Sequence, residues 1–310
     1  MRATISRLVL LAALAVSLTG CTTIVKHKVL ARVETVRDIE YAQAEGHSLK
    51  LDLYRPREFS GRLPVVIWIH GGAWRNGSKD NCPIDFLAAR GLAVVSLDYR
   101  LSNVATFPAQ IHDCKGAVRW LRAHADTYHL DPDHIGVLGA SAGGHLAALL
   151  GTTAGNTELE GTVGGNLEYP SHVQAVCAFY PPTDLDLLVV DHHARRSATG
   201  SVARLLGGPI AEKITLAARA SPVHYVSPQS APFFLVHGDR DEIVPLQQSE
   251  VMLSALQQAG VESQLEVVPG KGHGITAPRA AAKQIVQFLQ RHLTAGETSA
   301  TAANGGNGPF

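Results

Sequence analysis

Two hydrophobic patterns alternate along this chain. Short, mostly apolar runs, typical of β-strands buried on both faces of a sheet, occur at residues 63–70, 92–97, 134–138, 173–180 and 232–237, and residues 261–268 are predicted to form a further strand. Between them, apolar residues recur at helical spacing over residues 80–90, after Pro108, and over residues 145–150, 246–259 and 278–293. Strands that alternate with helices predict an α/β domain with a mostly parallel sheet and helices on both faces.

The start of the domain has a different pattern. Residues 36–44 and 49–54 alternate apolar and polar side chains on either side of Glu45-Gly46-His47. Two alternating segments joined by a short glycine-containing turn predict a β-hairpin. We therefore expect this hairpin to form an antiparallel edge of the sheet, so that the folded domain spans residues 36–293.

Two segments interrupt the alternation. Residues 151–169 are rich in Gly, Thr and Glu and form an irregular excursion after one helix. Residues 183–228 contain helical patterns near residues 201–206 and 211–219. Because ligands of open α/β sheets bind at the carboxyl ends of the strands, we expect residues 183–228 to form a small helical cap over that edge.

The termini lie outside this domain. Arg2 and Arg7 precede a short apolar run that ends in Leu18-Thr19-Gly20-Cys21, which indicates a secretory signal over residues 1–20. The run also resembles a bacterial lipoprotein signal, which implies lipidation of Cys21 and a membrane anchor. Thr22 then favours the outer membrane, facing the periplasm. Residues 21–35 are predicted to be a tether, and residues 294–310 a disordered tail.

Composition narrows the possible partners. The 310 residues are 45% hydrophobic, with zero formal net charge and no basic run, so we expect no nucleic-acid binding. An exported location permits disulfides, and a Cys82–Cys114 bridge is one possibility. Cys114 and Cys177 lie in apolar patterns, which favours buried thiols.

The sharpest chemical signal is a serine between a predicted strand and a predicted helix, in Leu138-Gly139-Ala140-Ser141-Ala142-Gly143-Gly144. The small residues allow a sharp turn, which places the Ser141 hydroxyl at its tip. The helix that starts there directs free backbone N–H groups at the same point. A Gly-x-Ser-x-Gly turn in this context predicts a nucleophile.

A serine nucleophile needs a base and a group that orients the base. Two loops that follow late strands supply candidates in the required chain order. His273 stands between glycines after the last predicted strand, and Asp239 and Asp241 both follow the preceding strand. The spacing alone leaves the choice between the two aspartates open.

These motifs together resemble the α/β-hydrolase superfamily, and most closely its exported esterase branch related to acetylxylan and feruloyl esterases. Kynurenine-formamidase-like and prolyl-oligopeptidase-like enzymes are near relatives. In that family a His-Gly-x-x-Asp-x-x-Val-Pro segment carries the acid at its fifth position, which implies Asp241 here. Asp239 is then expected to cap the loop.

The resemblance also implies an oxyanion hole. His70-Gly71-Gly72-Ala73-Trp74 is similar to the His-Gly-Gly-x motif of hormone-sensitive-lipase-type esterases, with Ala73 where a third glycine often stands. The implied donors are the backbone amides of Gly72, Ala73 and Ala142. Trp74 is expected to line the substrate pocket, or else to pack under the cap.

Other polar residues near these motifs are expected to be structural. His70 and His237 should hydrogen-bond loop backbone, and His145 should support the serine turn. Asp98 and Arg100 are expected to form an ion pair beside Tyr99, a support or rim residue. Asp191-His192-His193 is interpreted as a solvated cap loop, not as a metal site.

The resemblance implies a serine ester hydrolase for short or small acyl groups, on small molecules or on polysaccharides. Its mechanism requires no metal or other cofactor. An amide hydrolase of formamidase or peptidase type, with the same three residues, is the main alternative. A non-catalytic envelope-binding protein is a third hypothesis, and the sequence leaves the physiological substrate and oligomeric state open.

Overall fold

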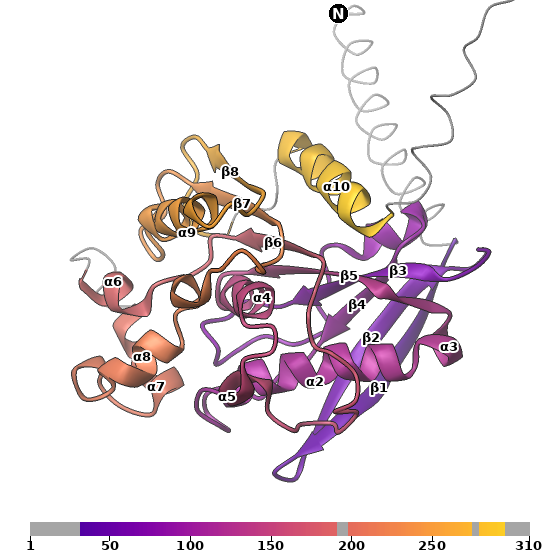
Figure 1. Ribbon diagram of the computed structural model, residues 1–310, viewed down its shortest axis with the longest axis horizontal. Coiled ribbons are helices and arrows are strands. Elements are labelled where there is room, and N and C mark those ends of the chain that lie inside the picture. The colour runs from indigo at the N-terminus through magenta and orange to yellow at the C-terminus, as the bar shows by residue number, and fades with distance from the viewer. Residues whose placement is uncertain (1–31, 191–197, 275–278, 295–310) are drawn as a thin grey trace, which may run out of the picture.

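The computed structural model describes residues 32–190, 198–274 and 279–294. In this part of the chain, one eight-stranded sheet has the order β1-β2-β4-β3-β5-β6-β7-β8 (Figure 1). The strands are β1 (Val33–Ala44), β2 (His47–Pro56), β3 (Leu63–Ile69), β4 (Ala93–Leu97), β5 (Leu130–Ala140), β6 (Ala175–Phe179), β7 (Phe233–Gly238) and β8 (Ser263–Val268). This is the α/β architecture that the alternating pattern predicts.

The predicted hairpin forms the antiparallel edge of the sheet. Strand β1 pairs antiparallel with β2, and β2 pairs antiparallel with β4. All other neighbouring strands are parallel. Since two reversals restore the original direction, β1 runs the same way as the parallel strands, and the β1–β2 turn lies at their carboxyl edge.

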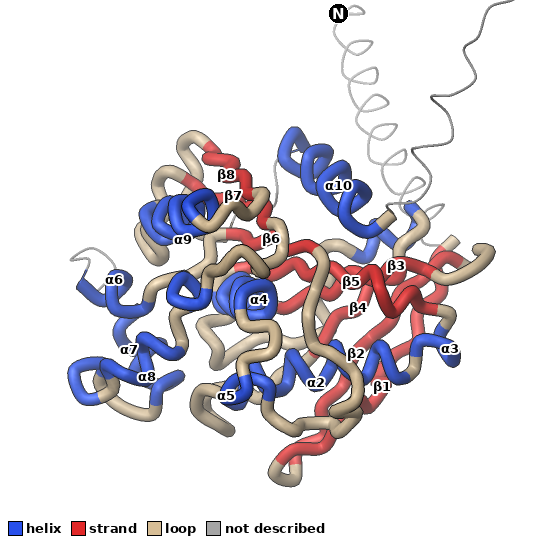
Figure 2. The backbone as a smooth tube through the Cα atoms, viewed as in Figure 1, coloured by secondary structure: helices blue, strands red, loops and turns tan. Residues whose placement is uncertain are grey.

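Helices cover both faces of the sheet, as Figure 2 shows. They are α2 (Ala109–Ala123), α3 (Ala125–Tyr128), α4 (Ala142–Thr152), α5 (Thr157–Glu160), α6 (Leu185–Val190), α7 (Ala198–Leu206), α8 (Ile214–Arg219), α9 (Gln247–Gln258) and α10 (Arg279–Leu293). Short 3₁₀ helices are η1 (Asp85–Arg90), η2 (Ile210–Glu212) and η3 (Pro222–Tyr225). The sheet separates two apolar cores, because side chains alternate between its faces. Helices α2, α4 and α9 contribute to one core, and η1 and α10 to the other.

Several helix predictions differ from the structure. The helix expected over residues 80–90 is only η1, because Pro83 lacks a backbone N–H and restricts the residue before it. It ends, as predicted, at Gly91, which has a φ of 86°. The segment expected near residues 211–219 is divided into η2 and α8 at Lys213. Helix α6 was not predicted.

The excursion after α4 is fastened to α2 by buried charges. Lys115 is fully buried, and its Nζ donates to the Glu160 carboxylate at 2.6 Å and to the Thr153 carbonyl at 2.5 Å. Arg119 donates to the backbone carbonyls of Glu160 and Val163. Breaking such a buried pair on one side is strongly destabilising, so this network fixes the path of residues 153–171.

Some expectations concern residues beyond the described part of the chain. The signal over residues 1–20, Cys21, Asp191-His192-His193 and residues 295–310 of the tail lie outside it, whereas residues 33–35, predicted as part of the tether, belong to β1. Among the described residues, no helix is long and apolar enough to cross a bilayer. Cys82, Cys114 and Cys177 are all free thiols, so the structure contains no Cys82–Cys114 bridge.

Candidate active site

Ser141 occupies a strained turn between β5 and α4. Its backbone has φ 55° and ψ −120°, a conformation that residues with a Cβ rarely adopt. The flanking glycines are required by close contacts. A Cβ on Gly139 would lie 2.1 Å from the Gly143 carbonyl oxygen, and one on Gly143 would lie 2.1 Å from the carbonyl oxygen of Ile69. The turn therefore closes tightly against the end of β3, with Ser141 at its tip.

The fold brings three distant side chains into one hydrogen-bonded chain. The Ser141 hydroxyl donates to Nε2 of His273 over 2.9 Å, and Nδ1 of His273 donates to Oδ2 of Asp241 over 2.8 Å. These residues follow β5, β8 and β7, whose carboxyl ends share one edge of the sheet. Such an arrangement lets the imidazole remove the proton from the serine as it attacks.

The Asp241 carboxylate is held in its ionised form. Burial raises its pKa, but the nearby His237 imidazole and the hydrogen bonds from His273 and the backbone amide of Val244 outweigh burial and hold the pKa well below its usual range. Oδ1 accepts hydrogen bonds from the backbone amides of Ile243 and Val244, each over 2.9 Å. A fixed, ionised carboxylate can orient the imidazole and stabilise its protonated form.

The two candidate aspartates have different surroundings. Asp239 accepts the backbone amide of Gly270 over 2.6 Å, so it caps the loop that follows β8. Asp241 is the aspartate that contacts His273. The geometry therefore matches the assignment implied by the family resemblance.

The loop after β3 lies directly against Ser141. A Cβ on Gly71 would be 3.4 Å from the Cβ of Ser141. Within the described chain, the backbone amides of Gly72, Ala73 and Ala142 make no hydrogen bond. Unpaired amides beside a nucleophile can stabilise a developing oxyanion.

Ala73 has a left-handed backbone, with a φ of 55°. The left-handed region disfavours residues with a Cβ by roughly 1–2 kcal/mol, which explains why related loops often carry glycine here. The loop is secured by hydrogen bonds from the amides of Arg75 and Asn76 to the Gly72 carbonyl, and from Ser102 to Trp74. These bonds hold Ala73 in its strained conformation.

Trp74 was expected to line the substrate pocket, with packing as the alternative. Its side chain is 3% exposed, and its indole N–H donates to Nδ1 of His145 over 3.1 Å. His145 Nε2 donates to the carbonyl of Ala220 over 2.6 Å. Burial lowers the pKa of His145 to about 4, so the imidazole is neutral. This burial favours the packing alternative, with Trp74 and His145 joining the oxyanion loop, the serine helix and residue 220.

The expected Asp98–Arg100 ion pair is wrong. Oδ1 of Asp98 accepts the amide of Lys79 over 2.7 Å, whereas the Arg100 guanidinium binds Asp113 and Glu45. Sequence proximity was misleading, because Asp113 comes from α2, which packs beside the loop after β4.

Tyr99 and His70 support the loop that follows β3. The Tyr99 hydroxyl donates to the His70 carbonyl over 3.1 Å, and the two rings stack with centroids 4.4 Å apart. The His70 Nδ1 lies 2.8 Å from the Gly71 carbonyl oxygen. Both residues therefore hold loop backbone, as predicted.

Sequence reasoning missed Tyr180 and Ser249. The Tyr180 ring packs edge-on against His273 with centroids 4.5 Å apart, and burial raises the pKa of its hydroxyl to about 12. Ser249 lies 2.7 Å from Nδ1 of His237. Tyr180 could have been identified from the sequence, because it follows the end of β6, the strand beside the serine turn.

In the described chain, no group of three or more His, Cys, Asp or Glu residues is placed to hold a metal ion.

A mostly parallel sheet of this order, with the Ser141 turn after β5 and with Asp241 and His273 after β7 and β8, defines an α/β-hydrolase fold. The chain belongs to the BD-FAE family, whose model matches residues 51–256, from β2 to α9.

Individual relatives agree with this assignment. The chain is 33% identical over 226 residues to the probable carboxylic ester hydrolase LipM of Mycobacterium tuberculosis, covering 71% of this chain and 51% of LipM. The chain thus spans about half the length of that relative.

Solved structures show the same likeness. A truncated carbohydrate esterase from gut microbiota superposes with a TM-score of 0.75 at 29% identity, covering 84% of this chain and 96% of that one. A bifunctional GH43-CE protein of Bacteroides eggerthii gives a TM-score of 0.76 at 34% identity, covering 84% and 35%.

Proposed function

We propose that this protein is a serine hydrolase that cleaves carboxylic esters of short or small acyl groups. The observation that carries the proposal is the continuous hydrogen-bond chain from Ser141 through His273 to Asp241. The names of its relatives, a carboxylic ester hydrolase and a carbohydrate esterase, support ester over amide cleavage.

The reaction begins when Ser141 Oγ attacks the acyl carbon and its proton passes to Nε2 of His273. Asp241 stabilises the imidazolium that results, and the free amides of Gly72, Ala73 and Ala142 stabilise the oxyanion. His273 then protonates the departing alcohol oxygen, which leaves the acyl group on Ser141. Water deprotonated by His273 attacks this acyl-enzyme, and the acid leaves as Ser141 recovers its proton.

The decisive test replaces the nucleophile. Ser141→Ala should lower kcat on p-nitrophenyl acetate by roughly 10⁴- to 10⁶-fold and abolish labelling by a fluorophosphonate probe. Ser254→Ala, at an exposed serine of α9, is the matched control and should retain both. Parental activity in Ser141→Ala would contradict the mechanism, and absence of labelling in the parent would favour the non-catalytic hypothesis.

Substrate preference needs a second experiment. Small molecules and polysaccharides that carry short acyl esters are the proposed substrates, and the carbohydrate esterase relative supports the polysaccharides. A series of p-nitrophenyl esters of increasing acyl length should show its highest kcat/KM at acetate or propionate. Parallel assays with N-formyl aromatic amines and dipeptide anilides test the amide-hydrolase alternative, which faster amide turnover would favour.

A lipid anchor at Cys21, which would hold the protein to the outer membrane facing the periplasm, is also proposed. Residue 33 starts β1 at the amino edge of the parallel strands, opposite the edge that carries Ser141. The proposed tether would therefore join the domain at the edge opposite the active site. Cys21→Ser should move the protein from the membrane fraction to the soluble periplasmic fraction without changing its specific activity.

A further inference from the structure

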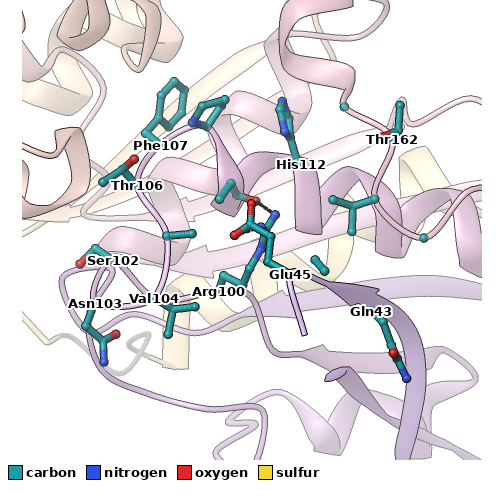
Figure 3. Close-up of a pocket in the computed structure, with 17 residues that line it drawn as sticks. Gln43, Glu45, Arg100, Ser102, Asn103, Val104, Thr106, Phe107, His112 and Thr162 are labelled. Atoms are coloured by element: carbon teal, nitrogen blue, oxygen red, sulfur yellow. Dashed lines mark hydrogen bonds and ion pairs between the residues drawn. The ribbon is translucent and has the colours of Figure 1, made fainter. Parts of the chain in front are cut away.

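A groove of about 920 Å³ lies beside the loop that follows β4. It is lined by residues 43–45 at and after the end of β1, Arg100, residues 102–109, His112 of α2 and the excursion at residues 161–164. Figure 3 shows Ser102, Asn103, Val104 and Thr106 on one side, Gln43 and Thr162 on the other, and Arg100 with Glu45 between them. The groove contains none of Ser141, Asp241 and His273.

The groove nevertheless opens at the same edge of the sheet as the active site. The β1–β2 turn and the loop after β4 both lie at the carboxyl edge of the parallel strands. The loop also contacts the oxyanion loop, because the amide of Ser102 donates to the Trp74 carbonyl over 2.7 Å. The wall of the groove is therefore joined to the loop that lies against Ser141.

The charges at the centre of the groove are already paired. The Arg100 guanidinium binds Asp113 through two nitrogens, at 2.9 and 2.7 Å, and its NH1 lies 3.3 Å from the Glu45 carboxylate. Two carboxylates thus face one guanidinium, and burial lowers the pKa of His112, the other basic group of the lining. An anionic ligand would meet no free positive charge here.

The remaining polar groups are amides and hydroxyls. Asn103, Thr106 and Thr162 are exposed, and within the described chain their side chains make no hydrogen bond. Such groups both donate and accept, as sugar hydroxyls do. A purely apolar ligand would instead remove water from these groups and from the Arg100–Glu45 pair without replacing its hydrogen bonds.

The two walls of the groove are held in place by contacts with helices α2 and α7. A Cβ on Gly161 would lie 2.5 Å from the His112 ring, so the excursion packs closely on α2. The opposite wall is tied to α7 by the amide of Phe107, which donates to the Leu205 carbonyl over 2.8 Å. A preformed site binds its ligand with little ordering entropy.

We infer that this groove is a binding site for an uncharged oligosaccharide, which it holds through side-chain amides and hydroxyls at a distance from the reacting ester. If the protein hydrolyses esters as proposed, the bound saccharide is the alcohol part of the substrate. The inference that the groove binds a saccharide does not depend on the proposed hydrolysis. Because the lining exposes no large aromatic ring for stacking, the affinity depends on hydrogen bonds.

Binding is tested apart from turnover, by ligand-observed NMR titration of Ser141→Ala with xylohexaose and with cellohexaose. At least one neutral hexamer should bind, and hexagalacturonic acid should bind more weakly. Adding Asn103→Ala with Thr106→Val, or Thr162→Trp to fill the groove, should weaken binding at least about fivefold. Gln257→Ala, an exposed residue of α9, is the control and should leave the Kd unchanged.

Turnover tests the link to the substrate. With Ser141 restored, Thr162→Trp should raise KM for acetylated xylohexaose at least about fivefold and leave kcat/KM for p-nitrophenyl acetate unchanged. The inference is overturned if neither neutral hexamer binds, or if the groove variants bind as tightly as Gln257→Ala. Groove-dependent binding by a protein that hydrolyses no ester would support the site while refuting the proposed function.

Discussion

Nε2 of the fully buried His237 lies 3.5 Å from Oδ2 of Asp241, the same oxygen that accepts the hydrogen bond from His273. The His237 ring is fixed on both sides, because Nε2 donates to the Val244 carbonyl over 2.8 Å and Nδ1 accepts from Ser249 over 2.7 Å. We therefore expect His237 to help hold the carboxylate in place, partly through Val244, whose amide donates to Oδ1 of Asp241 over 2.9 Å.

Replacing His237 should impair catalysis through Asp241. His237→Gln is expected to lower kcat on p-nitrophenyl acetate about tenfold, the effect of roughly 1.4 kcal/mol in transition-state stabilisation, with KM little changed. Ser249→Ala should have the same sign and a smaller size. His47→Asn, at an exposed histidine of the β1–β2 turn, is the control, and an equal loss in that variant would refute a specific positioning role.

The low pKa of Asp241 predicts a pH-dependent contribution to stability. Its folded-state pKa is below the ordinary value of 3.8, so the folded state favours the ionised form. The stabilisation is then fully present above about pH 5 and lost as the pH falls toward the folded pKa. Thermal unfolding of the parent and Asp241→Asn from pH 3 to 8 should give a Tm difference that is constant above about pH 5 and shrinks below about pH 4. A difference that grows on acidification would contradict this sign.

The backbone of the oxyanion loop can be tested at Gly72 and Ala73. A Cβ on Gly72, where φ is 116°, would lie 2.2 Å from the Asn76 carbonyl oxygen, so Gly72→Ala must displace the loop. Loss of one oxyanion donor lowers kcat by about 10²- to 10³-fold, and we expect a fall of that size. Ala73→Gly removes the left-handed strain and should retain activity with an equal or higher Tm.

Gly46→Ala separates backbone strain from loop geometry. Gly46 also has a positive φ, of 79°, but no atom lies within 4 Å of a Cβ placed there. This variant should lose some stability and no activity. If Gly46→Ala and Gly72→Ala lowered kcat equally, the displaced loop could not be the cause.

The strand pattern and the serine turn were predictable because both depend on local chemistry. Most of the apolar strands are buried on two faces, and the contact between Gly139 and Gly143 that closes the turn is local, whereas Gly143 is also constrained by the carbonyl oxygen of Ile69 from β3. The choice of Asp241 over Asp239 came from family resemblance, since both follow β7 in the sequence. Asp239 accepts a hydrogen bond from the amide of Gly270, whereas Asp241 accepts from His273 and from the amides of Ile243 and Val244.

The errors arose where the partner comes from another element. Arg100 binds Asp113 of α2 instead of its near neighbour Asp98, and no periodicity reveals which helix packs there. The left-handed φ of Ala73 is likewise invisible in composition, because tertiary contacts hold it. Long-range packing therefore decides the details that the local pattern leaves open.

The Trp74–His145 hydrogen bond offers a final test, because it joins the proposed oxyanion loop to α4 and to the carbonyl of Ala220. Trp74→Phe keeps a buried ring but leaves Nδ1 of His145 without its donor, and an unsatisfied buried polar group costs about 1–3 kcal/mol. The variant should therefore lose that much unfolding free energy in urea, and kcat should fall as the loop loosens.

A double-mutant cycle with His145→Leu separates the hydrogen bond from packing. Since His145→Leu removes the acceptor, Trp74→Phe should cost at least about 1 kcal/mol less in that background than in the parent. Trp120→Phe, in the same pair of backgrounds, is the control, because Trp120 stacks on His124 instead. Additive losses for Trp74→Phe and His145→Leu would mean that the two residues contribute independently, and that the hydrogen bond between them does not couple the loop to the serine helix.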